Sequence, residues 1–128
     1  MSSDPQVIAV VDDESSMRTM LGRVLRLADY RVAAYPSGES FLASLATSRP
    51  DCALLDIRMS GLSGFEVQSR LRAAHTGIPV VLMTASDDTG LDRSALEAGA
   101  VCLLRKPFTS NELLAAVGIA LDPSSPPT

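Results

Sequence analysis

The sequence has no tryptophan, a single histidine and only two cysteines. Cys52 and Cys102 each lie inside an apolar run, with no second Cys or His nearby at metal-ligand spacing, so we expect two buried, reduced thiols. His75 stands beside Thr76 and Gly77 with no adjacent acid to orient it, which predicts a solvated histidine on a surface loop. These absences argue against a site built from cysteine or histidine ligands.

Long hydrophobic runs and clusters of basic residues are also missing. No apolar run approaches the roughly 20 residues of a membrane-spanning helix, and the N-terminus lacks a basic, apolar signal pattern, so we expect a soluble cytoplasmic protein. The 15 acidic and 11 basic residues give a formal charge of −4, which argues against direct nucleic-acid binding by this segment. Neither a Gly-x-Gly-x-x-Gly motif after the first apolar run nor a Walker-type loop occurs, so nucleotide binding is not expected.

A chain of 128 residues is long enough for one compact domain. After residue 121 the composition becomes rich in proline and serine and too polar to pack. We therefore expect an N-terminal tail at 1–6, one folded domain at 7–121 and a linker or tail at 122–128.

Four short apolar runs are continuous rather than alternating, which predicts strands of a parallel sheet covered on both faces. A fifth, more polar run has β-branched and aromatic residues and predicts an edge strand at 31–35. Helical patterns separate the runs, and right-handed crossovers then require a five-stranded, doubly wound parallel α/β sheet with helices on both faces. The four continuous runs are 7–11, 52–55, 79–83 and 101–104.

The expected helices differ in how clearly they are marked. Apolar residues at three- and four-residue steps predict the first helix over 17–28, with Ser15 and Ser16 as candidate caps. The stretch 89–98 has little apolar surface, so we expect it to be the most mobile helix. Two later helices begin with capping boxes, in which a hydroxyl and a carboxylate each satisfy a backbone N–H: Ser63 with Glu66, and Thr109 with Glu112.

Polar side chains follow four of the expected strands at their carboxyl ends, where open α/β sheets bind ligands. Carboxylates crowded there repel one another unless a cation neutralises them, and ligation by oxygen alone favours Mg²⁺. Asp56 ends the central strand and is the best candidate nucleophile, which implies an aspartyl phosphate as product. Thr84 and Lys106 would stabilise the transferring phosphoryl group electrostatically. The converging residues are Asp12, Asp13, Asp56, Thr84 and Lys106.

From about Val7 to Leu121 the sequence resembles the receiver domains of two-component response regulators. The resemblance implies a flavodoxin-like (CheY-like) fold with strand order 2-1-3-4-5. It also implies a regulatory phosphoacceptor, which catalyses only its own phosphorylation and dephosphorylation and takes the phosphoryl group from a sensor histidine kinase or a histidine phosphotransfer protein. The motifs that carry it are Val11-Asp12-Asp13-Glu14, Leu54-Leu55-Asp56-Ile57-Arg58-Met59, Met83-Thr84-Ala85 and Arg105-Lys106-Pro107-Phe108.

The resemblance assigns a role to each matching residue. It implies that the signal passes to an output domain or partner protein, for instance in transcription regulation. It also implies a possible homodimer through the last helix, the strand at 101–104 and the helix at 89–98. The implied roles are Asp56 as phosphoacceptor, Asp12 and Asp13 as metal-binding acids, the backbone carbonyl of Arg58 as a further metal ligand, Thr84 as switch hydroxyl, Lys106 as phosphate contact and Lys106–Pro107 as a cis peptide.

Two positions depart from the family pattern. Leu103 stands where these domains usually have a Tyr or Phe, which predicts weak or differently routed coupling to Thr84. Ser60 stands where proline is common, so the chain regains an N–H and loses a fixed φ, which predicts a looser loop.

Two other functions are compatible with part of the pattern. A phosphatase of the haloacid-dehalogenase-like class also uses an Asp nucleophile and Mg²⁺, but its second acid would lie two residues after Asp56, where Arg58 stands. A pseudo-receiver that signals without phosphorylation would fit Leu103. The intact acidic motif favours the phosphorylated receiver over both.

Overall fold

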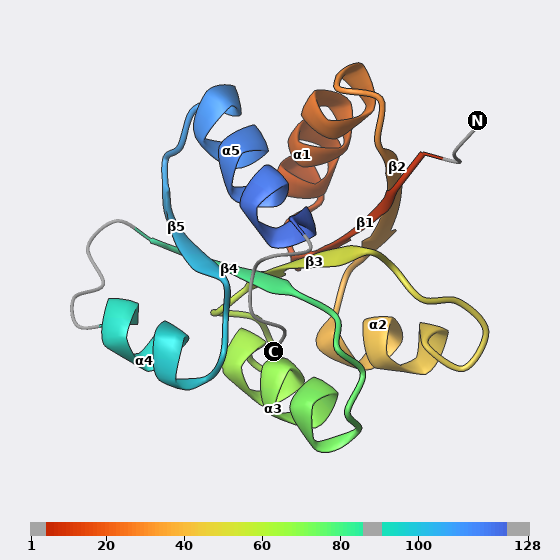
Figure 1. Ribbon diagram of the computed structural model, residues 1–128, viewed down its shortest axis with the longest axis vertical. Coiled ribbons are helices and arrows are strands. Elements are labelled where there is room, and N and C mark those ends of the chain that lie inside the picture. Colours follow the sequence, from red (N-terminus) through yellow and green to blue (C-terminus); the bar gives the residue numbers. More distant parts are fainter. Residues whose placement is uncertain (1–4, 86–90, 123–128) are drawn as a thin grey trace.

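The computed structural model of the chain describes residues 5–85 and 91–122 (Figure 1). Most of the expected tails at 1–6 and 122–128 lies outside these residues, as do positions 89 and 90 of the expected fourth helix. Strands and helices alternate five times, as predicted. The elements are β1 (Val7–Val11), α1 (Ser15–Leu27), β2 (Arg31–Tyr35), α2 (Gly38–Ser44), β3 (Cys52–Asp56), α3 (Gly64–Ala73), β4 (Val80–Ala85), α4 (Leu91–Glu97), β5 (Cys102–Lys106) and α5 (Ser110–Leu121).

The strands form one parallel sheet in the order β2-β1-β3-β4-β5, which confirms the expected topology. β1, β3 and β4 are buried almost throughout, so the prediction of strands covered on both faces is confirmed for these three. β5 is also covered on both faces, since Leu104 lies in the core under α1 and α5 and Leu103 packs against the core under α2 and α3, but of its residues only Leu104 is fully buried. β5 lies at an edge of the sheet, like β2, and therefore has a strand neighbour on one side only.

Helices cover both faces of the sheet. Helices α1 and α5 pack on one face, and α2, α3 and α4 pack on the other (Figure 1). Alternate side chains of each central strand point to opposite faces: Val10 belongs to the core under α1 and α5, and Val11 to the core under α2 and α3. The two apolar cores fix each strand in register, and so fix where its last residue lies.

The helix starts agree with the sequence at two of three sites. The capping boxes of Ser63 with Glu66 and of Thr109 with Glu112 are present, each with both hydrogen bonds. The prediction that Ser15 or Ser16 caps the first helix is wrong: α1 begins at Ser15, and Glu14 is its N-cap, without a side-chain hydrogen bond. Instead, the carboxylate of Asp12 accepts the backbone N–H of Glu14 at 2.9 Å and so shapes the turn into α1.

Both cysteines are free thiols. Cys52 is buried as expected, and burial, with smaller contributions from Cys102 and Asp51, raises the pKa of its thiol to about 12. Cys102 is only partly buried, because it lies on the edge strand β5. His75 is exposed, as predicted. Among the described residues, no helix is both long enough and apolar enough to cross a membrane.

Candidate functional site

The carboxyl ends of β1, β3 and β5 bring three acids and one lysine together. Asp12 and Asp13 follow β1, Asp56 is the last residue of β3, and Lys106 is the last residue of β5. One carboxylate oxygen each of Asp12, Asp13 and Asp56 lies within 4.8 Å of the others. Asp12 is 0% exposed and Asp56 is 6% exposed, whereas Asp13 lies at the surface. These three acids are called the acidic triad below.

Lys106 is the only lysine of the chain and pairs with two of the three acids. Its Nζ lies 3.3 Å from Oδ2 of Asp12 and 3.3 Å from Oδ2 of Asp56. The opposite oxygens of both acids are also held: Oδ1 of Asp12 accepts the N–H of Glu14 at 2.9 Å, and Oδ1 of Asp56 accepts the N–H of Arg58 at 3.2 Å. Both buried carboxylates are thus fixed with Oδ2 toward the lysine.

Burial and neighbouring charges shift the pKa values of Asp56 and Lys106. Burial and the neighbouring Asp12 raise the pKa of Asp56 from 3.8 to about 6, against the opposing effects of Lys106 and the Arg58 N–H. Burial alone would lower the pKa of Lys106, but the carboxylates of Asp56 and Asp12 outweigh it and raise that pKa above its usual value. The site therefore favours the positively charged form of Lys106 and the protonated form of Asp56.

The acidic triad fits a metal cation. Three ionised carboxylates and one ammonium group leave about two negative charges at the rim of the sheet, which a divalent cation would neutralise. The donors are carboxylate oxygens, the ligands that hard cations prefer. The residues present could therefore bind a metal ion, and the site offers that ion access from the side of the exposed Asp13.

The remaining residues named by the resemblance lie around this cluster. Thr84 is 0% exposed and lies on β4, next to Met83, which pairs in register with Asp56. Leu103 is partly buried on β5, pairs with Leu82 and packs against the core under α2 and α3. The peptide bond between Lys106 and Pro107 is cis, the isomer that the resemblance implies.

One contact of the site was missed at the level of sequence. From the sequence alone, Ser60 is a departure from the family pattern that predicts a looser loop. In the structure its backbone N–H donates to Oδ2 of Asp13 at 3.1 Å, and its hydroxyl donates to the same oxygen at 3.3 Å. The sequence does show that Ser60 has an N–H that proline would lack. Its acceptor, Asp13, is 47 residues away in sequence, so the contact could not be predicted from local sequence.

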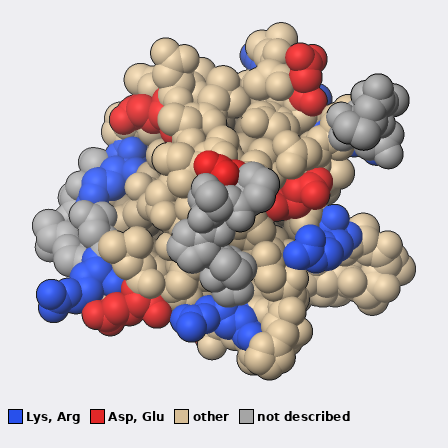
Figure 2. Space-filling model, in the orientation of Figure 1, with Lys and Arg blue, Asp and Glu red and all other residues tan. Residues whose placement is uncertain are grey.

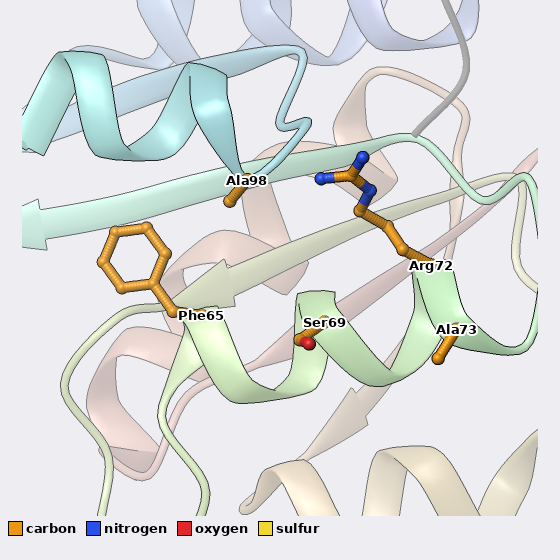
Figure 3. Close-up of a pocket in the computed structure, with 5 residues that line it drawn as sticks. All are labelled: Phe65, Ser69, Arg72, Ala73 and Ala98. Atoms are coloured by element: carbon orange, nitrogen blue, oxygen red, sulfur yellow. The ribbon is translucent and has the colours of Figure 1, made fainter.

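Two hollows flank α3. One, of about 600 Å³, opens beside the acidic triad and is lined by Asp13, Arg58 and Ser60 among others. The other, of about 500 Å³, lies between α3 and the end of α4, where Phe65 and Arg72 extend toward Ala98 (Figure 3). The described residues that line this second hollow include no acid, and the guanidinium of Arg72 donates to the carbonyl of Glu97 at 3.3 Å. Of these two hollows, the first opens beside the candidate site.

Comparison with known proteins identifies a family. Residues 8–118 match the model of the response regulator receiver domain. The chain is 38% identical over 115 residues to the DNA-binding transcriptional regulator NtrC of Salmonella typhimurium, a match that covers 90% of this chain and 24% of NtrC. It is 34% identical over 119 residues to the transcriptional regulatory protein FixJ of Bradyrhizobium diazoefficiens, covering 93% of this chain and 58% of FixJ. The chain thus spans less than two thirds of each of these relatives.

Solved structures agree with the fold. The crystal structure of FixJ-N superimposes with a TM-score of 0.86 at 30% identity, covering 94% of this chain and 95% of that one. The response regulator StyR superimposes with a TM-score of 0.80 at 38% identity, covering 93% of this chain and 60% of that one.

Proposed function

Because the chain belongs to the response regulator receiver domains, which are regulatory phosphoacceptors rather than enzymes, we propose that Asp56 accepts a phosphoryl group from a phosphohistidine. The observation that carries this proposal is the acidic triad, whose oxygens lie within 4.8 Å of one another, with Lys106 3.3 Å from Asp56. Asp56 is the acid at the end of the central strand β3, directly beside that lysine.

The chemistry follows from the groups in place. A carboxylate oxygen of Asp56 attacks phosphorus, the P–N bond of the phosphohistidine breaks, and the imidazole of the donor leaves with the bond electrons. Lys106 and the hydroxyl of Thr84 stabilise the charge on the transferring group, and the ammonium group of Lys106 is already beside the nucleophile. Hydrolysis of the acyl phosphate by water returns Asp56 to its resting state.

We assign the metal as Mg²⁺, held by Asp12, Asp13, Asp56 and the backbone carbonyl of Arg58. An all-oxygen donor set with carboxylates supports this choice, since Mg²⁺ prefers such ligands together with phosphate oxygens. Bound there, the ion would neutralise the acids and the incoming phosphoryl group. We further propose that Thr84 reports phosphorylation and that Leu103 replaces the usual aromatic partner in the switch.

A sensor histidine kinase, or a histidine phosphotransfer protein, is the proposed donor, and the cytoplasm the proposed location. The receiver domain would span 7–121, between an N-terminal tail at 1–6 and a linker at 122–128. Output would pass through a further domain or partner, for example in transcription regulation, with a homodimer through α4, β5 and α5 as one route. Basic and acidic side chains are interspersed on the face shown in Figure 2, so the described residues of this face do not form a continuous basic patch. This mixed charge supports the proposal that the segment does not bind nucleic acid directly.

The experiment is incubation with Mg²⁺ and a small-molecule phosphodonor, followed by intact-mass measurement. We expect one added phosphoryl group on the wild type and none on Asp56→Asn. An undiminished adduct on Asp56→Asn would contradict the assignment. No adduct on the wild type, once rapid hydrolysis is excluded by rapid quenching, would favour the pseudo-receiver suggested by Leu103. Release of many phosphate molecules per protein from phosphate esters would favour the phosphatase instead.

A further inference from the structure

We propose that Ser60 is a positioning residue, which holds the carboxylate of Asp13 in the acidic triad and thereby strengthens Mg²⁺ binding. This inference rests on the function proposed above and concerns the same site. Ser60 lies in the loop between β3 and α3, and Asp13 lies in the loop between β1 and α1. Their contact therefore joins two loops of the site through side-chain and backbone donors of a single residue.

The three carboxylates of the triad are held in different ways. Asp12 and Asp56 are buried, and each faces Lys106 with Oδ2 at 3.3 Å. Asp13 is exposed, and in the described part of the chain the ion pairs of Lys106 are those with the two buried acids. Among the described residues, the hydrogen bonds to the Asp13 carboxylate come from Ser60, from its N–H at 3.1 Å and its hydroxyl at 3.3 Å.

The hydrogen bonds from Ser60 matter because the carboxylates of the acidic triad repel one another. Asp13 is repelled by two neighbouring carboxylates, and as an exposed side chain it can relieve that repulsion by turning toward water. Hydrogen bonds to an ionised oxygen are roughly twice as strong as neutral ones, so two of them oppose this rotation. Both are accepted by Oδ2, and neither engages Oδ1. Ser60 can thus restrain the side chain while one oxygen remains outside these contacts.

A competing effect of the same hydrogen bonds would change the Mg²⁺ affinity in the opposite direction. If the Ser60 hydrogen bonds had to break before a cation could bind, removing them would tighten Mg²⁺ binding. The sign of the change in affinity therefore distinguishes positioning from competition. Mutating a residue that orients a metal ligand typically lowers the affinity for the metal by about 10–100-fold.

The test is calorimetric titration of Mg²⁺ into the wild type and two variants of Ser60. Ser60→Ala keeps the backbone donor and loses the hydroxyl, so we expect the Kd for Mg²⁺ to rise about tenfold, the lower end of that range. Ser60→Thr keeps both donors and should restore the affinity to within about twofold of the wild type. Ser69→Ala, an equally conservative change at an exposed position of α3, should leave the affinity unchanged.

A double-mutant cycle with Asp13→Asn separates positioning from a general structural effect. If Ser60 acts through the Asp13 carboxylate, Ser60→Ala should change the Mg²⁺ affinity of the Asp13→Asn protein by less than about twofold. An unchanged or tighter Kd for Ser60→Ala alone, or an equal loss in both backgrounds, overturns the proposal. Circular dichroism melts of all variants confirm that each is folded.

The outcome is separable from that of the proposed function. A wild type that binds Mg²⁺ and forms the Asp56 adduct, with variants of Ser60 that bind Mg²⁺ equally well, contradicts the role of Ser60 alone. A wild type that neither binds Mg²⁺ nor forms the adduct contradicts both proposals.

Discussion

The ammonium nitrogen of Lys106 lies 3.3 Å from Oδ2 of Asp56, although the two residues are 50 positions apart. Lys106 is also the only lysine in the chain, so no other lysine can supply this charge. The proposed nucleophile and the cation that would stabilise its product are therefore in contact in the unphosphorylated protein. Substitution of either Lys106 or Asp56 tests the importance of this contact.

Removing the lysine should slow phosphorylation far more than it affects folding. In Lys106→Gln the phosphoryl group loses a donor aimed at its developing charge, which typically costs about 10²–10³-fold in rate. We expect the Asp56 adduct to form slower by about that factor at saturating Mg²⁺, followed by intact mass against time with a small-molecule phosphodonor. Arg105→Gln, the same loss of charge one residue earlier on β5, should change the rate little; equal slowing in both variants would contradict the specific role.

The titration of Asp56 predicts how stability depends on pH in the metal-free protein. Its pKa rises from 3.8 to about 6 on folding, so the fold favours the protonated form. The corresponding stabilisation is fully present below about pH 3.8 and is lost as the pH rises through about 6. In EDTA at pH 7.5, Asp56→Asn should therefore be more stable than the wild type, by about 1–2 kcal/mol after allowance for solvent screening.

Urea unfolding of both proteins from pH 4 to 7.5 checks this prediction. The difference in free energy of unfolding should shrink as the pH falls toward the usual pKa of an aspartate. A difference that stays constant over the range would mean that Asp56 titrates normally in the folded protein.

The buried side chain of Gln68 on α3 is a position at which we expect a substitution to stabilise the protein. Its side chain is 0% exposed, and within the described part of the chain neither its amide nitrogen nor its oxygen has a hydrogen-bond partner. A buried polar group without a partner costs about 1–3 kcal/mol, whereas an apolar side chain of similar shape avoids that cost. We expect Gln68→Met to raise the free energy of unfolding by about 1–3 kcal/mol, measured with urea. Gln6→Met, at an exposed position, is the control and should change it little; a loss of stability in Gln68→Met would refute the reasoning.

The sheet and the acidic triad were predictable because strand identity and strand ends are local properties of the sequence. Continuous apolar runs specify buried parallel strands, and the residue that ends each run then lies at one rim of the sheet. Asp12, Asp56 and Lys106 could thus be placed near one another from their positions alone. The strand order itself came from the family resemblance, since alternation of strands and helices does not specify it.

The features that were missed depend on contacts between distant segments. Gln68 occurs in an exposed-looking stretch of α3, and only the packing of that helix buries it. The donors of Ser60 find Asp13 across 47 residues. Both the burial of Gln68 and the contact of Ser60 with Asp13 arise only when segments far apart in the sequence pack together.

At Gly64 the start of α3 approaches closely to Asp56, the proposed phosphoacceptor. A Cβ at this buried first residue of α3 would lie 2.6 Å from the backbone oxygen of Asp56 and 2.9 Å from the Cα of Ile57. Both neighbours are backbone atoms, which cannot rotate away, so Gly64→Ala must push the start of α3 from the end of β3. We expect a loss of about 1–3 kcal/mol in the free energy of unfolding, together with slower phosphorylation of Asp56.

The matched control is Gly118→Ala on α5, where nothing lies within 4 Å of an added Cβ. There alanine only replaces the less favourable glycine within a helix, so stability should rise by about 0.5–1 kcal/mol and the phosphorylation rate should not change. Urea unfolding and the intact-mass time course measure both quantities for both variants. If Gly64→Ala lost stability but phosphorylated at the wild-type rate, the close approach of α3 would serve packing alone, and the position of Asp56 would be set by the sheet.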